Sequence, residues 1–348
     1  MERRDFLALT GVAAGLAAGA AATGAAAKIR STDLASLKGP AVDLTTPEGN
    51  MNAWARLLGN TDMKSTKYGW AQGLIQGVRP GEAIRDICGF TMMSCARLLP
   101  HESGTGYRKV LREVGLYTDL KTGEIIEEMV NPYLNETVKI VPITNDPFNH
   151  TITPYVSAPP SYGGLNKTTP PPQPKPLQLD WTRRGSVLNM FSHINLFYPS
   201  SLPPAKWPRE NGNPFNQVTE TFLYQIPWAD MQNARKTSVE YGGTWSRTTP
   251  WLPWLLMGPT PGHCQYATFM GAYDDINRID RKTLDYVQKH FPLYLTAPEK
   301  WVDPSLSSLE LYARTQTPAP VAAGQPVPRA LDPELPAWFK AMQAKKPG

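Results

Sequence analysis

The chain has 348 residues and a formal net charge of +5 at pH 7, and charged side chains make up only 19% of the sequence. They form no basic run, which argues against the clustered lysines and arginines of a nucleic-acid-binding face. The 35 prolines exclude long uninterrupted helices and favour short strands joined by ordered loops, so the composition predicts a β-rich protein.

Residues 1–27 have the features of a twin-arginine export signal. Arg3 and Arg4 precede a weakly apolar stretch of glycine and alanine at 11–20, and small residues continue to Ala27. The alternative is a membrane anchor, but this stretch is too short to supply the roughly 20 apolar residues of a spanning helix. We therefore expect the twin-arginine export machinery to deliver the chain to a periplasmic or secreted location, with cleavage near Ala27 and no stable membrane anchor.

The first half of the body alternates between strand-like and turn-like residues. Residues 52–59 predict a short helix or a first strand that enters the core. Between 68 and 90, glycines and prolines interrupt an alternating pattern, which favours strands with bulges over a helix. Strand-like segments at 114–119, 125–130 and 137–141 then follow one another around turns, on the spacing of an antiparallel meander.

The second half continues this pattern after a break. Residues 157–176 are rich in proline and glycine and predict a long surface loop, although a domain boundary would have the same composition. A helix is expected late, where Asp280 can cap residues 281–290 and Pro292 stops them. Further strands are expected at 186–191, 219–226, 239–247 and 263–270.

These elements predict a mainly β protein with a single domain over residues 45–312. Its architecture would be an antiparallel β-barrel or a strongly bent sheet, of lipocalin-like character and with a few peripheral helices. Residues 313–348 are rich in proline and alanine and predict a flexible tail.

Three cysteines, Cys88, Cys95 and Cys264, are an odd number for an oxidising compartment. One disulfide beside a free thiol is possible on this count, and the pairing cannot be deduced from sequence. The spacing fits no C-x-x-C motif, so we expect the three side chains to behave as small buried hydrophobic groups.

Several short motifs stand in a fixed order along the chain. They are YTDLKTGE (117–124), NP (131–132), NDPFN (145–149), TWSR (244–247), PWLPW with MG (250–258) and LTAPEKW (295–301). Together with the twin-arginine leader, this ordered set resembles DUF1838, a family of exported bacterial proteins of unknown function, over roughly residues 45–312. The family carries no settled activity, so the resemblance implies one exported domain and no particular reaction. The proline-rich insertion at 157–176 departs from the family pattern.

A block of aromatic residues is the strongest local feature of the body. Trp245, Trp251, Trp254 and Met257 fall within thirteen positions. They predict one wall of an apolar ligand pocket, to which Tyr241 would add another ring. The alternative is a structural plug, in which prolines fix a corner and the tryptophans cover a barrel end.

Residues 145–150 form the best polar cluster. Asp146 and His150 are candidates for a general acid–base pair over one ligand. Asn145 or Asn149 would hold a carbonyl or hydroxyl group, and Arg247 would bind an anion or stack on a neighbouring indole. The alternative is ordinary turn chemistry, in which these side chains satisfy the local backbone.

The sequence lacks the motifs of the commonest cofactor enzymes and hydrolases. It has no phosphate-binding loop, no dinucleotide-binding glycine motif and no zinc-protease motif, so neither a cofactor nor a metal is predicted. We expect an exported protein that binds a small hydrophobic or aromatic molecule, with or without a cofactor-free lyase, hydratase or isomerase step. The alternatives are a non-catalytic periplasmic ligand carrier and a structural envelope protein.

Overall fold

The residues described by the computed structural model are 33–156, 173–303, 305–334 and 337. The predicted export signal at 1–27 and most of the predicted loop at 157–176 lie outside them. Within the described ranges, no helix is long and apolar enough to cross a membrane.

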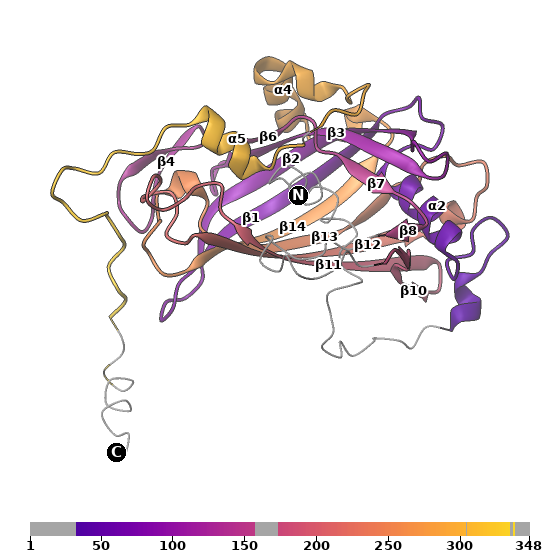
Figure 1. Ribbon diagram of the computed structural model, residues 1–348, viewed down its shortest axis with the longest axis horizontal. Coiled ribbons are helices and arrows are strands. Elements are labelled where there is room, and N and C mark those ends of the chain that lie inside the picture. Colours follow the sequence, from indigo (N-terminus) through magenta and orange to yellow (C-terminus); the bar gives the residue numbers. More distant parts are fainter. Residues whose placement is uncertain (1–32, 157–172, 304, 335–336, 338–348) are drawn as a thin grey trace, which may run out of the picture.

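One antiparallel sheet of ten strands forms the body (Figure 1). In spatial order its strands are β10 (Asp180–Arg184), β11 (Val187–Pro199), β12 (Phe215–Pro227), β13 (Tyr241–Thr249), β14 (His263–Tyr273), β1 (Lys67–Val78), β2 (Arg85–Pro100), β3 (Tyr107–Thr118), β6 (Ile143–Asn145) and β7 (His150–Ile152). The last two are short, and both pair with β3. The predicted mainly β, antiparallel character is therefore confirmed.

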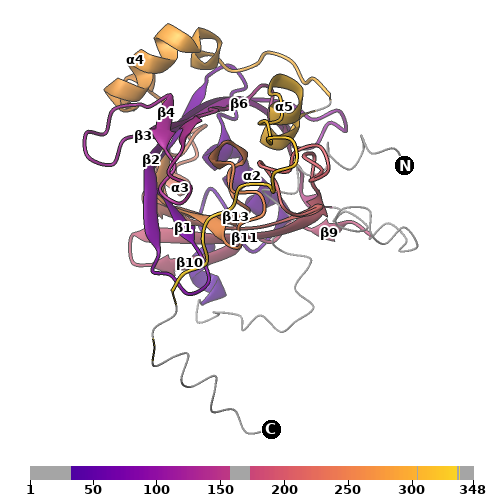
Figure 2. The same ribbon diagram turned by 90° about the vertical axis from the view of Figure 1, so that its left-hand side faces the viewer.

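The sheet curves around the helix α2 (Pro47–Leu58), as Figure 2 shows. Its hydrogen-bonded path starts at β10 and ends at β6, and no pairing among the described strands joins these two ends. Of the two predicted architectures, the closed barrel is not formed and the bent sheet is.

Two hydrophobic clusters lie on opposite faces of β2 and β3. Successive side chains of a strand point to opposite faces, so Phe90 packs in the inner cluster and Met93 in the outer one. The outer cluster is covered by α4 (Arg281–His290), which contributes Leu284 and Val287 (Figure 1). This helix was predicted, and its cap is confirmed, because the Asp280 carboxylate accepts a hydrogen bond from the Thr283 amide.

Of the two structures expected for residues 52–59, the helix is formed: residues 52–58 lie in α2 and Gly59 is its C-cap. Thr46 caps it and Pro47 occupies its first turn, where a missing amide hydrogen costs nothing. The fully buried Asn50 then ties α2 to its surroundings. Its Nδ2 donates to two backbone carbonyls of 44–46, and its Oδ1 accepts from the Leu179 amide at 3.0 Å and from Trp181 Nε1 at 2.7 Å.

The predicted meander at 114–141 is only partly formed. Its first segment belongs to β3, but the next two form a separate hairpin, because β6 and β7 already occupy the free edge of β3. The strands outside the main sheet are β4 (Glu128–Val130) with β5 (Thr137–Lys139), and β8 (Tyr155–Val156) with β9 (Lys175–Pro176).

The remaining helices are short. They are η2 (Leu34–Leu37), α3 (Trp228–Met231), η4 (Pro253–Leu255), η5 (Ile276–Arg278), η6 (Pro292–Leu295) and α5 (Ser308–Thr315). After α5, the chain predicted as a flexible tail bonds to the body at three points. The Ala319 amide donates to Glu210, the Ala330 amide donates to Thr260, and the Leu331 carbonyl accepts from Arg79.

The thiols of Cys88, Cys95 and Cys264 are all buried and free. The disulfide that the odd count left open is therefore not formed, and the three side chains pack as small hydrophobic groups.

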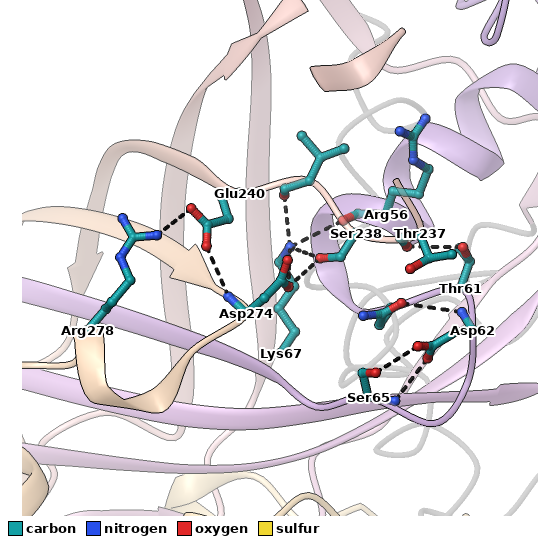
Figure 3. Close-up of polar contacts among 12 residues, drawn as sticks. Arg56, Thr61, Asp62, Ser65, Lys67, Thr237, Ser238, Glu240, Asp274 and Arg278 are labelled. Atoms are coloured by element: carbon teal, nitrogen blue, oxygen red, sulfur yellow. Dashed lines mark hydrogen bonds and ion pairs between the residues drawn. The ribbon is translucent and has the colours of Figure 1, made fainter. Parts of the chain in front are cut away.

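A buried lysine ties α2 to the loop between α3 and β13 (Figure 3). The ammonium of Lys67 donates to Ser238 Oγ at 2.5 Å, to the Val239 carbonyl at 2.8 Å and to the Arg56 carbonyl at 3.3 Å, and it lies 3.8 Å from Asp274. Burial lowers the pKa of Lys67 to about 8, although Asp274 opposes this shift. The unfolded chain therefore holds this proton more tightly than the folded chain does.

Replacing Lys67 by methionine tests this linkage. Between pH 8 and 10.5 the unfolded state binds more protons at Lys67, so the contribution of Lys67 to stability rises with pH across this window and is lost as the pH falls through 8. We expect the difference in unfolding free energy between wild type and Lys67→Met to grow by roughly 3 kcal/mol across it, measured by urea unfolding. The exposed neighbour Lys64 supplies the control variant Lys64→Met, whose curve should parallel that of the wild type. A parallel curve for Lys67→Met would contradict the linkage.

The Asn50 network gives a second stability prediction. Aspartate has nearly the same shape as asparagine, but Asn50→Asp replaces the Nδ2 donor by a carboxylate oxygen. That oxygen faces the two backbone carbonyl oxygens to which Nδ2 donates. We expect a loss of about 3 kcal/mol or more in unfolding free energy, because buried acceptors lose their partners. Asn195→Asp, at an exposed position whose Oδ1 only accepts from Thr219, should change it by less than about 0.5 kcal/mol.

Candidate functional site

A cavity of about 290 Å³ lies on the inner face of the bent sheet. Trp54 and Leu58 of α2 and Ser308 and Leu309 of α5 also line it. Its aromatic wall consists of residues from several strands and from the segment that joins β6 to β7: Trp70, Phe90, Phe148, Tyr198, Phe222, Tyr224, Tyr241 and Trp245. Its acidic, basic and amide side chains are Lys109, Glu113, Asn145, His150, Glu220 and Arg247. Apolar rings with a few polar groups are the usual composition of small-molecule sites.

Strand β3 supplies two of the ionisable groups, because alternate residues of a strand face the same side. Lys109, Leu111 and Glu113 line the cavity, whereas Val114 packs in the outer cluster beneath α4. Lys109 and Glu113 thus enter the hollow from a strand whose other face carries Val114 in the outer cluster and also Arg108 and Arg112, which pair with Glu102 and Asp146.

Asn145 and His150 reach the cavity from the edge of β3. Asn145 lies opposite Glu113 and His150 lies opposite Lys109. Asn145 and His150 are five residues apart, whereas their partners Glu113 and Lys109 are four apart on β3. The segment that joins β6 to β7 therefore carries one extra residue. In a regular strand a five-residue step would put the two side chains on opposite faces. The extra residue therefore brings both to the cavity.

The carboxyl group of Glu113 is held by Asn145, whose Nδ2 donates to Glu113 Oε1 at 2.5 Å. Burial raises the pKa of Glu113, although the Asn145 hydrogen bond and the Lys109 charge oppose the shift. The group therefore gains its proton at a higher pH than an exposed glutamate, which suits an acid–base catalyst.

Lys109 and His150 lie side by side across β3 and β7. Burial lowers the pKa of Lys109 to about 8, against the attraction of Glu113. Burial, together with the Lys109 charge, also lowers the pKa of His150 well below its usual value, so its imidazole is neutral at neutral pH. No three His, Cys, Asp or Glu side chains converge as metal ligands in the part of the chain that the structure describes.

Arg247 and Glu220 form an ion pair across β13 and β12. The two residues are opposite each other in the register, and Arg247 Nη1 lies 3.4 Å from Glu220 Oε1. Burial opposes the charge of Arg247, but the Glu220 carboxylate and nearby tyrosines more than offset it and raise the pKa. Arg247 is thus charged, and its charge is compensated within the cavity.

Trp245 is at the centre of the aromatic wall. Its ring stacks on Phe222 with a centroid separation of 6.1 Å, and it also packs against Phe90 and Tyr266 at 6.0 and 5.3 Å. Trp245 Nε1 and Arg247 Nε are buried without a hydrogen-bond partner among the described residues. Two residues on the same face of β13 therefore each keep a donor that no described residue accepts.

Five of the residues predicted from sequence line this cavity together. They are Asn145, His150, Tyr241, Trp245 and Arg247. The sheet thus collects residues that are up to 102 positions apart (247 minus 145) around one space.

The rest of the tryptophan–proline block lies elsewhere. Trp251 and Trp254 line a smaller cavity of about 100 Å³, which shares Arg247 with the larger one. Trp251 is also fixed in the core, because its Nε1 donates to the Thr260 carbonyl at 2.9 Å. Met257 is fully buried and lines neither cavity. The block therefore acts partly as a cavity wall and partly as core.

Asp146 does not reach the cavity. Because Asn145 faces inward, the next residue of the chain faces away, and Asp146 Oδ1 accepts from Arg112 Nε at 2.8 Å. Asn149 is buried and holds another segment, with its amide donating to Ser305 Oγ and its Nδ2 to the Val302 carbonyl. Asp146 and His150 therefore do not line one cavity together as expected: the carboxyl groups that line it with His150 are Glu113 and Glu220.

Lys109, Glu113 and Glu220 are absent from the residues predicted from sequence. The signal for the first two is their even spacing, which places Lys109, Leu111 and Glu113 on one face of a strand. The predicted strand at 114–119 begins after both of them, so this alternation falls outside it. Glu220 lies within a predicted strand, and only its position opposite Arg247 in the register identifies it as a residue of the site.

The comparison with protein families agrees with the ordered motifs. A family model described as a protein of unknown function, DUF1838, matches residues 63–316. No curated protein matches the chain. Because the match covers well over half of the sequence, the chain belongs to the DUF1838 family, as its motifs predicted.

Proposed function

We propose that this chain binds a small, neutral hydrophobic or aromatic molecule in the cavity of its bent sheet. The observation that carries the proposal is a cavity of about 290 Å³ with an aromatic wall, the Arg247–Glu220 ion pair, and Lys109 and Glu113 on the same face of β3. A ligand held by a curved antiparallel sheet is also what the predicted lipocalin-like character implies. The size lies near the lower end of small-molecule sites, which favours a ligand of one or two rings.

The charges in the cavity favour a neutral ligand. Glu220 compensates Arg247, and Glu113 faces Lys109 along β3. An anionic ligand would have to compete with these carboxylates, so the expected role of Arg247 as an anion holder is less favoured than a hydrogen bond to a neutral oxygen. The unused donors of Trp245 and Arg247 support a ligand that carries at least one oxygen acceptor.

The site of action is proposed from the leader alone. A twin-arginine signal at 1–27 would export the folded protein, so the ligand would be met in the periplasm or outside the cell. A structural envelope protein remains the rival of a binding protein. A structural role does not require a cavity with such donors. A ligand that is retained through purification and detected by native mass spectrometry would argue against a structural envelope protein.

The aromatic wall gives the first binding test. Phe222 stacks on Trp245, and its loss removes one face of the cavity. We expect Phe222→Ala to weaken the binding of 2-acetylnaphthalene at least tenfold, because a buried ring is worth about 1.5–3 kcal/mol. The measurement is the quenching of tryptophan fluorescence on titration with the probe.

Phe191→Ala is the matched control, since Phe191 is 45% exposed and does not line the cavity. It should bind 2-acetylnaphthalene as the wild type does, and the charged analogue 2-naphthoate should bind more weakly to all three proteins. Equal losses in the two variants, or no saturable binding of any neutral naphthalene derivative, would contradict the proposal.

An enzyme is the second candidate function, favoured by the hydrogen-bonded Glu113 beside Lys109 and His150. These groups are suited to move a proton next to a carbonyl group, as in a cofactor-free isomerase, lyase or hydratase step. A carrier would need a binding wall but no such cluster. An enzyme and a carrier therefore differ in whether the protein catalyses proton exchange on the bound molecule.

We expect the protein to speed the exchange of the methyl protons of 2-acetylnaphthalene in D2O, followed by NMR. Glu113→Gln should slow this exchange by about a hundredfold or more, since a general base typically contributes that much. The rate should fall with decreasing pH through a value above 4.5, where Glu113 becomes protonated. Asp146→Asn should leave it unchanged. If the probe binds without catalysed exchange in any variant, the carrier replaces the enzyme.

A further inference from the structure

Lys109 differs from the other charged groups of the cavity in having no partner of its own. Asn145 donates to Glu113, and Glu220 pairs with Arg247. Within the described ranges, Lys109 takes part in no hydrogen bond and no ion pair, although it is half-buried and lines the cavity. A cation in such a place is costly unless something in the cavity uses it.

Lys67 shows what a structural lysine looks like in the same protein (Figure 3). Its ammonium makes three hydrogen bonds and lies near Asp274, and its side chain is only 2% exposed. The hydrogen-bonding capacity of its ammonium is thus taken up by protein groups. Lys109 has the opposite environment, with an unpartnered amine, an adjoining cavity and two proton-exchanging neighbours.

We propose that Lys109 captures an aldehyde or ketone in this cavity as a covalent imine. The proposal rests on the proposed function, because it names the substrate class of the same cavity. An aromatic aldehyde or ketone is neutral, carries one oxygen acceptor and presents a flat ring to Phe222 and Trp245. It is therefore the class of molecule that the walls and the charges together favour.

The reaction needs only groups that the cavity supplies. The neutral amine of Lys109 attacks the carbonyl carbon, and the electron pair of the C=O bond moves to oxygen, which takes a proton from protonated Glu113. The proton lost from nitrogen passes to His150 or back to the Glu113 carboxylate. A proton from Glu113 or His150 then protonates the hydroxyl oxygen, and the nitrogen lone pair expels it as water to leave an iminium ion. The iminium returns its N–H proton to the same group and becomes the imine. Amine and carbonyl compound thus become imine and water, with no change of oxidation state.

The environment of Lys109 supports its role as a nucleophile. Burial lowers the pKa of Lys109 to about 8, against an ordinary value of 10.5. At pH 7.5 its neutral fraction is then on the order of a hundredfold larger than that of an exposed lysine. Glu113 on β3, His150 on β7 and Asn145 on β6 are the titratable or polar side chains that line the cavity beside it.

Reductive trapping tests the proposal. The full chain is incubated with 2-naphthaldehyde and cyanoborohydride at pH 7.5, which converts an imine into a stable secondary amine, and the labelled peptides are identified by mass spectrometry. We expect Lys109 to be labelled at least ten times faster than the exposed Lys121, and an excess of naphthalene to slow the labelling of Lys109 alone. Lys109→Arg, which keeps the charge, should lose the adduct while Lys67→Met retains it.

Binding of 2-acetylnaphthalene, followed by fluorescence in the same samples, separates the two levels of failure. If the probe binds but Lys109 is labelled no faster than Lys121, the imine proposal is overturned and the proposed function stands. If the probe does not bind and Lys109 is not labelled, both are overturned. Where Lys109→Arg fails to fold, Lys109→Met replaces it, and the labelling rate at Lys109 in the wild type decides the matter alone.

Discussion

The alternation of side chains along β3 determines what the cavity contains. A strand shows successive residues to opposite faces, so this one strand places Lys109 and Glu113 in the hollow and Val114 under α4. A shift of its pairing by one residue would turn Lys109 and Glu113 outward and bring Arg108 and Arg112 into the hollow, away from their partners Glu102 and Asp146. The outer cluster beneath α4 opposes such a shift, and so it fixes the chemistry of the inner face from the other side of the sheet.

The edge of β3 depends on the same constraint. Asn145 and His150 could not both face the cavity on a regular strand, and one extra residue between them corrects the phase. The correction turns Asp146 outward to Arg112. The regular alternation of β3 brings Lys109 and Glu113 to the cavity, and the extra residue at its edge brings Asn145 and His150 there.

Two lysines, Lys67 and Lys109, differ in whether protein groups compensate their charge. Lys67 and Lys109 both have a pKa lowered to about 8 by burial, yet the first is saturated by protein groups and the second is not. A lowered pKa alone therefore does not identify a functional lysine. What distinguishes Lys109 is the combination of a cavity, an ammonium that bonds to none of the described residues, and the titratable neighbours Glu113 and His150.

The sequence predicts the local elements better than their arrangement. Proline content and alternation indicate the antiparallel strands, and Asp280 with Pro292 indicates α4, because these signals are local. The choice between a barrel and an open sheet depends on whether distant edges pair, which no local pattern reports. The cavity shows the same limit: Arg247 and His150 stand out as residue types, but the partners Glu220 and Glu113 become visible only through the register. Asp146 lies outside the cavity because adjacent residues of a strand face opposite ways, and its neighbour Asn145 faces inward.

The most direct measurement of the central claim is a crystal structure of the protein soaked with 2-bromonaphthalene, with data collected at the bromine absorption edge. The account predicts one strong anomalous peak inside the cavity, against the rings of Trp245 and Phe222. Peaks confined to the outer face of the sheet, or no peak at a concentration that quenches the tryptophan fluorescence, would contradict it.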